Sequence, residues 1–336
     1  MRKQLGFLAL AATLILLIAG ELSIGPEGVT PGLVIAALTA FDPQNYDHAI
    51  IFHQRLPRVL IALYVGTVTA CGGAVLQSLT RNPLAAPSTL GITGGATFFV
   101  VTAAFLFDLG LQWQGVAGLV GGVAGFAVAV LVARATGRGN DPRGLALILS
   151  GALTGLLLTG AANAVLLSDP SRRTSFLGWL SGNINHVYID RLALFWWVGA
   201  AALVVLALLS RSITMIAIGA DRAAAAGVDV GRVSGAALLA VCLGTASAVA
   251  ICGPVAFVGL VVPHMVRPLT GLGLSRLMPA AAVAGASICL AADLIGRLAF
   301  QPYTVSTGVL MDAIGGIAFA LLVRRHYIAS PGRSTA

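Results

Sequence analysis

Charge is scarce in this sequence. Charged residues make up 10% of the 336 residues, whereas a soluble domain carries roughly a quarter. Hydrophobic residues make up 58%, and the mean hydropathy is +0.94. These values exclude a disordered chain, a coiled coil and a water-soluble enzyme. The apolar stretches are long and do not alternate with polar residues, which predicts an all-α polytopic membrane protein.

Lysine is nearly absent, because 19 of the 20 basic residues are arginine and the one lysine is Lys3. A P-loop needs Gly-x-x-x-x-Gly-Lys-Ser/Thr, so this chain cannot cradle a nucleotide in that way. The sequence also lacks His-Glu-x-x-His and Gly-x-Ser-x-Gly. We therefore expect no enzymatic activity and no cofactor bound by this chain.

Cysteine is rare as well, and the four cysteines form no Cys-x-x-Cys pair. Each lies in or beside an apolar run, which predicts small buried side chains rather than metal ligands. The net charge of +8 does not indicate nucleic-acid binding, since no arginine run exceeds two residues. Membrane topology explains that charge better.

Ten apolar runs are long enough to be membrane spans or nearly so. We place them at about residues 5–24, 56–80, 91–107, 115–134, 144–167, 192–210, 234–252, 255–268, 278–298 and 304–323. The first follows Arg2 and Lys3 and could be a signal peptide. It lacks a small-x-small cleavage site before Glu21, which favours a retained helix.

The basic residues predict the orientation, because cytoplasmic loops are enriched in Lys and Arg. With the N-terminus inside, six arginines fall outside: Arg55, Arg58, Arg172, Arg173, Arg191 and Arg297. Fourteen basic residues fall inside: Arg2, Lys3, Arg81, Arg134, Arg138, Arg143, Arg211, Arg222, Arg232, Arg267, Arg276, Arg324, Arg325 and Arg333. Both termini are therefore predicted to be cytoplasmic.

Three connecting segments are too long for simple turns. Residues 25–54 and 168–190 are predicted outside, and residues 211–232 form the longest inner loop. The short apolar stretch from Leu33 to Leu38 cannot span and is expected to lie on the bundle. The whole chain, 1–336, is predicted to be a single transmembrane domain.

The inner loop contains a short helical pattern between Gly219 and Gly227. Asp221 can cap a helix, the following alanines favour it, and Gly227 can end it in a left-handed turn. A helix of one to two turns is marginal alone, so something should pack on it. The pattern indicates a docking site for a cytoplasmic partner, and a simple connector is the alternative.

Arg55 and Arg58 lie three residues apart at the start of the second span, on either side of Pro57. Pro57 suits a first helical turn, where the helix dipole disfavours cations. Two cations there imply an anionic partner such as a lipid headgroup, an acidic ligand or an acidic protein. Interfacial snorkelling is the alternative.

Asp293 precedes Arg297 by four residues in the ninth span, which predicts an ion pair within one helix. Asp312 lies inside the tenth span with no evident local partner. An intramembrane carboxylate suggests a functional site, and burial against another subunit is the alternative. His264 is predicted to be structural, and Arg81-Asn82-Pro83-Leu84 resembles an ordinary helix stop.

Four stretches together resemble the permease subunits of the type II ATP-binding-cassette importers for ferric siderophores, vitamin B12 and haem. They are residues 55–96, 219–233, 253–271 and 292–298. The resemblance implies a bundle of ten helices like that of the vitamin B12 permease. It also implies a second permease, two ATPases that carry ATP and magnesium, and a periplasmic or lipid-anchored substrate-binding protein.

The resemblance also assigns roles to residues. Arg55, Arg58 and Arg297 would dock the binding protein, and Asn82 and Leu84 would line the cytoplasmic gate. The coupling helix on the ATPase would comprise Gly219, Ala220, Asp221, Arg222, Ala223, Ala224, Ala225, Ala226 and Gly227.

One difference from the pattern of these permeases narrows the class of substrate that we expect. Val305-Ser306 stands where many relatives have Leu-Pro, and with Ile295-Gly296-Arg297 it looks more like ferric catecholate-siderophore permeases. In that group the two permeases are often different chains, which favours a homologous heterodimer over a homodimer. The location implied is a bacterial cytoplasmic membrane.

Two other functions remain as alternatives. Asp293 and Asp312 could serve an ion-coupled secondary transporter, which needs no ATPase. An intramembrane enzyme is the weaker alternative, because catalytic motifs are absent.

Overall fold

The computed structural model describes residues 2–25, 29–136, 144–301 and 303–324, and these residues form helices and connecting loops without a β-strand. The elements are α1 (Arg2–Ser23), α2 (Pro31–Thr39), α3 (Tyr46–Ile50), the π-helix η1 (Ile51–Arg55), α4 (Leu56–Leu79), the 3₁₀-helix η2 (Pro87–Leu90), α5 (Ile92–Phe105), α6 (Leu111–Ala135), α7 (Leu145–Leu166), α8 (Pro170–Leu180), the 3₁₀-helix η3 (His186–Tyr188), α9 (Ile189–Ile218), α10 (Ala220–Ala225), α11 (Val230–Cys252), α12 (Val258–Thr270), α13 (Leu274–Leu298) and α14 (Thr307–Val323).

Each of the ten predicted spans corresponds to one helix in the described part of the chain. Seven helices, or continuous helical stretches, are long and apolar enough to cross a membrane; their spanning helices are α1, α4, α6, α7, α9, α11 and α13. The other three are α5, α12 and α14, which have 14, 13 and 17 residues. At 1.5 Å per residue they are shorter than the roughly 30 Å hydrocarbon core. The predicted all-α bundle is confirmed.

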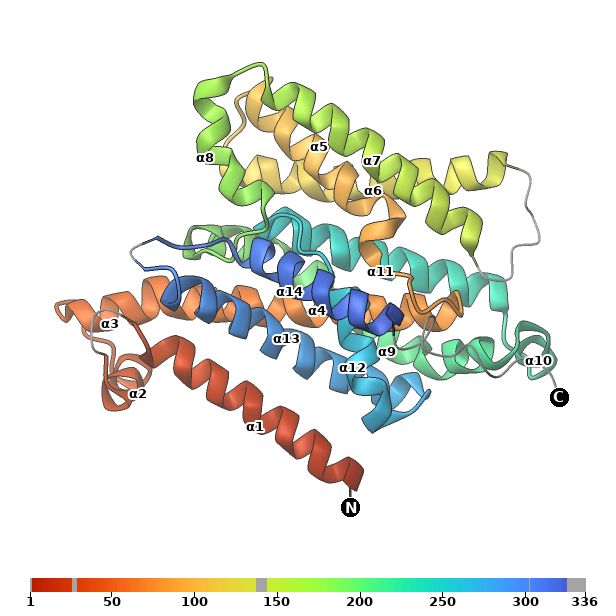
Figure 1. Cartoon of the computed structure of the whole chain (residues 1–336), viewed down its shortest axis with the longest axis horizontal. Helices are drawn as coiled ribbons and strands as arrows, with labels where there is room; N and C mark the ends of the chain where they lie inside the picture. Colours follow the sequence, from red (N-terminus) through yellow and green to blue (C-terminus); the bar gives the residue numbers. More distant parts are fainter. Residues whose placement is uncertain (1, 26–28, 137–143, 302, 325–336) are drawn as a thin grey trace.

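The two ends of the bundle carry different short elements (Figure 1). At one end lie α2, α3 and α8, and we call it the α8 end. At the other end lies α10, and we call it the α10 end. Helix α1 begins toward the α10 end, and α14 runs back toward it. Four of the arginines counted as cytoplasmic lie outside the described residues: Arg138, Arg143, Arg325 and Arg333.

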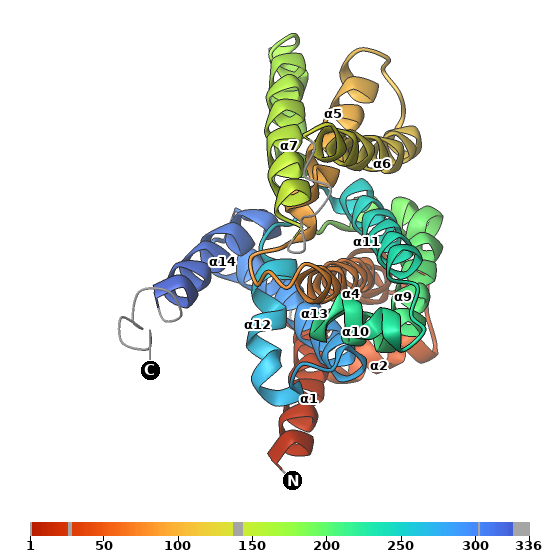
Figure 2. The ribbon, with the colours of Figure 1, turned by 90° about the vertical axis from the view of Figure 1, so that its right-hand side faces the viewer.

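Helix α4 runs through the middle of the bundle and packs on α9, α11, α12 and α13 (Figure 2). Two glycines of α4 permit this close packing. A Cβ at Gly73 would overlap the backbone of Gly259 in α12, and one at Gly66 would overlap that of Gly285 in α13. Small residues at such crossings let helix backbones approach closely. The close packing of α4 on α12 and α13 therefore depends on these two glycines.

Two predicted spans are extended more than the others in the structure. The second is preceded by a continuous helical stretch from Tyr46, because the Asn45 side chain accepts hydrogen bonds from the amides of Asp47 and His48. The sixth was predicted to end at residue 210, but α9 continues to Ile218. The inner loop is correspondingly shorter than predicted.

Candidate functional sites at the two ends of the bundle

Helix α10 is a six-residue helix that joins α9 to α11 and packs on both. Gly227 has φ +85°, so it adopts the left-handed conformation predicted for it. The Gly227 amide donates to the carbonyl of Ala224, and the Val228 amide donates to that of Ala223. These two bonds form a Schellman motif, which satisfies the last carbonyls of the helix.

The start of α10 differs from the prediction. The capping residue is Gly219 rather than Asp221, and no side chain caps the helix. Asp221 lies in the first turn, where the positive end of the helix dipole favours a carboxylate.

Most of α10 faces solvent. Ala223 is buried against the bundle, whereas Asp221, Arg222, Ala224 and Ala225 are exposed, as are Ala226 and Gly227. A helix this short gains little from its own hydrogen bonds. Its exposed residues therefore leave an accessible surface at the α10 end.

The residues expected to form the gate lie in the loop that follows α4. The Asn82 side chain accepts a hydrogen bond from the Leu84 amide at 2.9 Å, which closes a local turn. Leu84 is exposed. The structure thus shows Asn82 as a turn-forming residue and Leu84 as an accessible apolar side chain.

Arg81 connects this loop to the helix that precedes α10. It adopts φ +48°, an uncommon conformation for a residue other than glycine. Its guanidinium donates to the carbonyl of Ile216 at 3.0 Å, in the last turn of α9. Three residues after Ile216, Gly219 begins the α10 segment. A direct contact therefore joins the loop of Asn82 and Leu84 to the end of α9, just before α10.

At the α8 end, a buried ion pair joins α4 to α13. Arg58 donates to both carboxylate oxygens of Asp293, at 2.9 and 2.7 Å. The Thr307 hydroxyl donates to the same carboxylate at 2.8 Å. Asp293 is only 2% exposed, so this bidentate pair and the hydroxyl together satisfy a buried charge.

A second ion pair joins α1 to α13. The Arg297 guanidinium lies 2.9 Å from a carboxylate oxygen of Glu21, which is fully buried. Arg297 also donates to the carbonyls of Glu21 and Ile24. Arg55 is likewise buried and donates to the carbonyl of Leu22 at 2.8 Å. Both arginines hold the end of α1 against the bundle.

This geometry corrects the predicted pairing. Asp293 does not pair with Arg297, although they lie one helical turn apart, because each side chain binds a residue on another helix. The geometry also changes the environment expected for the docking arginines. Arg58 and Arg297 expose only 14% and 15% of their side chains, and Arg55 is 2% exposed. The structure brings all three to the α8 end, beneath its surface.

Sequence reasoning missed the role of Arg191, which was counted only among the outer arginines. Arg191 is 1% exposed and donates to the carbonyls of Leu111 and Ala250 and to the side chain of Gln114. It thereby connects the first turns of α9 and α6 to the end of α11. Its position at the start of an apolar run gave no sign of these carbonyl acceptors.

The remaining candidates have simple surroundings. His264 contacts the carbonyl of Leu260 one turn earlier through a ring nitrogen, as expected for a structural histidine. Asp312 is exposed on α14. All four cysteines are buried and free, and the described residues contain no cluster of three or more metal-binding side chains.

Comparisons with known proteins give consistent matches over nearly the whole chain. Residues 12–325 match the FecCD transport family. The ferric enterobactin permease FepD of Escherichia coli is 34% identical over 93% of both chains. The iron(3+)-hydroxamate permease FhuB of Bacillus subtilis is 33% identical over 95% of this chain and 83% of its own.

The fold is also similar to that of a solved structure. A transporter described as being of the metal-chelate ABC type, in an inward-facing conformation, superimposes with a TM-score of 0.81. The two chains are 26% identical, and the match covers 95% of this chain and 98% of the other.

Proposed function

The chain belongs to the FecCD transport family, and from this premise we propose that it is the membrane-spanning permease of an ATP-driven importer for ferric siderophores. The similar proteins include permeases named for ferric enterobactin and for iron(3+)-hydroxamate. ATP would be hydrolysed by a separate subunit, since this chain carries no P-loop. The protein would therefore not be an enzyme by itself.

The geometric observation that carries the proposal is the exposed surface of α10. The helix packs on α9 and α11 with Ala223 buried, and the Schellman motif at Gly227 ends it, while its other face is accessible. A helix held in this way can transmit a push from a bound partner to α9 and α11. We therefore assign residues 219–227 as the coupling segment that rests on an ATPase subunit.

Movement of α10 would reach the gate through Arg81. The hydrogen bond from Arg81 to Ile216 joins the end of α9 to the loop that contains Asn82 and Leu84. A shift of α10 would pull on this bond and reposition Leu84. In this mechanism Asn82 shapes the gate loop, and Leu84 is the side chain that moves into or out of the path.

The α10 end would face the cytoplasm of a bacterium, with both termini on that side and the bundle in the inner membrane. The positive-inside bias supports this orientation. A periplasmic or lipid-anchored binding protein would then dock at the α8 end. Arg55, Arg58 and Arg297 would support docking chiefly by holding α1, α4 and α13 in position, since each is engaged within the chain.

A second permease would cover the apolar faces of α7 and α14. Leu153, Leu156 and Leu157 of α7 and Ile314 and Ile317 of α14 are exposed. Helix α14 projects from the bundle and packs mainly on α12 and α13 (Figure 2). We favour a second permease that is a homologous but different chain. The alternative is a pair of identical chains, and the mass of the purified complex distinguishes the two.

Within the ferric siderophores, the sequence of residues 303–308 favours a catecholate. The relatives named above cover both enterobactin and hydroxamate systems, so the class of siderophore is part of the proposal. Vitamin B12 and haem are the alternative cargoes. Competition between labelled ferric catecholate and unlabelled hydroxamate, B12 or haem in an uptake assay distinguishes them.

The ion-coupled alternative is less consistent with the geometry. Asp293 holds Arg58 with both oxygens and accepts from Thr307, so its lone pairs are largely occupied. An exchangeable ion would have to displace these partners. Asp312, the other carboxylate considered for such a mechanism, is exposed on α14.

Co-purification tests the proposal. The tagged chain, expressed together with the proposed ATPase and second permease, should retain the ATPase when purified in detergent. A bulky substitution on the exposed face, Ala225→Trp, should release the ATPase. The matched change Ala236→Trp, at an exposed position of α11, should not. Failure of the wild-type chain to retain any ATPase would refute the assignment.

A further inference from the structure

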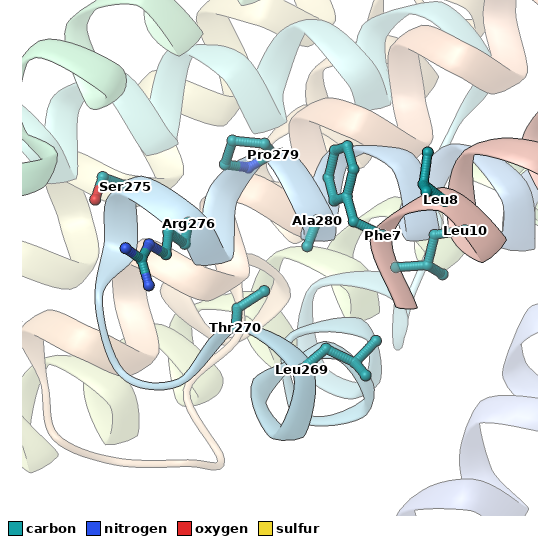
Figure 3. Close-up of a pocket in the computed structure, with 9 residues that line it drawn as sticks. All are labelled: Phe7, Leu8, Leu10, Leu269, Thr270, Ser275, Arg276, Pro279 and Ala280. Atoms are coloured by element: carbon teal, nitrogen blue, oxygen red, sulfur yellow. The ribbon is translucent and has the colours of Figure 1, made fainter. Parts of the chain in front are cut away.

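A groove opens at the α10 end of the bundle, between the first turns of α1 and the turn that joins α12 to α13 (Figure 3). Its volume is about 750 Å³, within the range of small-ligand sites. The contact that forms one edge is between Gly6 and Leu269, where the missing side chain of Gly6 lets α1 approach the Leu269 methyl groups.

The inner part of the groove is apolar. Phe7, Leu8 and Leu10 of α1 line one side, and Pro279 and Ala280 of α13 line the other. Phe7 and Leu8 are exposed in the isolated chain. Only about a tenth of the most apolar stretch of α1 is buried, so this helix presents its side chains to the membrane interior. The apolar walls are therefore placed where acyl chains are available.

The outer part of the groove is polar and basic. Arg276 and Ser275 lie in the first turn of α13, and Thr270 is the last residue of α12. Figure 3 shows these three at the opposite end of the groove from Leu8 and Leu10. None of the described side chains that line the groove is acidic. The Thr270 hydroxyl donates to the carbonyl of Val266. The Arg276 guanidinium, the Ser275 hydroxyl and the start of a helix together suit an anion.

We propose that this groove binds an anionic phospholipid, with its phosphate at Arg276 and Ser275 and an acyl chain along Phe7, Leu10 and Ala280. The order of the groups supports this occupant, because the cation is at the end of the helices and the apolar walls lie one to two turns deeper. Basic pockets between membrane helices bind anionic headgroups in this way. The inference requires only that the bundle spans a membrane and does not depend on the transported cargo.

Native mass spectrometry of the intact transporter tests the site. The complex would be purified from membranes, equilibrated with mixed micelles of phosphatidylglycerol and phosphatidylcholine, and the retained lipids counted. Wild-type protein should retain phosphatidylglycerol in preference to phosphatidylcholine. Arg276→Gln should lower that retention about fivefold, the effect of one arginine near the headgroup. Inorganic phosphate should not displace the lipid, because it cannot fill the apolar part.

Arg232→Gln is the matched control. Arg232 and Arg276 are each the third residue of a helix that begins at the α10 end, but Arg232 does not line the groove. Retention should be unchanged in this variant. Equal losses in both variants would mean that general surface charge attracts the lipid, and no loss in Arg276→Gln would overturn the site.

The apolar part is tested separately. A diazirine on the acyl chain of phosphatidylglycerol should cross-link to peptides containing residues 7–10 or 269–280. Phe7→Gln should reduce this cross-linking, and Leu16→Gln, an exposed position of α1 outside the groove, should not. Cross-links spread evenly over the exposed helices would contradict a defined groove.

Discussion

Asp293→Asn probes the buried ion pair that joins α4 to α13. The carboxylate of Asp293 is 2% exposed, and the Arg58 side chain is 14% exposed. Removing one partner of such a pair leaves a poorly solvated charge and typically costs 3–5 kcal/mol. Because asparagine keeps one acceptor for Arg58 and Thr307, we expect a loss near the lower limit, about 3 kcal/mol.

Asp108→Asn is a control with the same chemistry at the surface. Asp108 accepts from Arg172 at 2.8 Å, nearly the 2.7 Å of the buried pair, but the two side chains are 81% and 48% exposed. Exposed pairs contribute at most about 1 kcal/mol, so this variant should unfold almost as the wild type does. The comparison therefore isolates the effect of burial.

The cysteines provide the assay. Cys71, Cys242, Cys252 and Cys289 are buried and free, so a thiol-reactive fluorogenic dye should report unfolding of the core on heating. Asp293→Asn should lower the midpoint by several degrees, with little change for Asp108→Asn. Equal midpoints for the two variants would refute the reasoning that this pair stabilises the α8 end.

Three further predictions follow from particular contacts. Gly227→Ala should reduce the cargo-stimulated ATPase activity of the complex, because a residue with a Cβ costs about 1–2 kcal/mol in the left-handed conformation. Gly219→Ala should keep this activity, because the backbone of Gly219 is extended at φ 175°. Arg81→Gln should lower uptake while leaving ATPase retention unchanged, since it removes the bond to Ile216 but does not alter the α10 surface; normal uptake would exclude Arg81 from coupling. Gly73→Ala should reduce the yield of folded protein, measured by size-exclusion chromatography, because its Cβ would overlap the α12 backbone. Gly235→Ala should not reduce the yield, because no described atom outside its own helical turn lies within 4 Å of a Cβ added there.

The helices were predictable from the sequence because their signal is local. A long apolar run predicts a membrane span whichever helices it packs against. Helix α7, for example, begins and ends within one residue of the predicted limits. The turn at Gly227 was predictable for the same reason, since four alanines followed by glycine favour a short helix and its left-handed end. Polar caps were less informative: Asp221 did not cap α10, and Asn45 extended the helical stretch that leads into α4.

The charge pairs were not predictable, because they depend on the packing of distant helices. Asp293 had Arg297 four residues away, yet it pairs with Arg58, 235 residues away in sequence. A buried carboxylate gains most from a bidentate guanidinium, and Arg58 can offer one only after α4 and α13 have packed together. Arg297 is left to hold Glu21, which sequence reasoning used only to judge a cleavage site.

The most direct test of the account is ATP-dependent uptake by the reconstituted transporter. Proteoliposomes containing this chain, its second permease and the ATPase would be supplied with binding protein and a radioiron-labelled ferric catecholate. We expect accumulation only with hydrolysable ATP enclosed in the liposomes and with binding protein present. Accumulation by this chain alone under a proton or sodium gradient, without nucleotide, would contradict it.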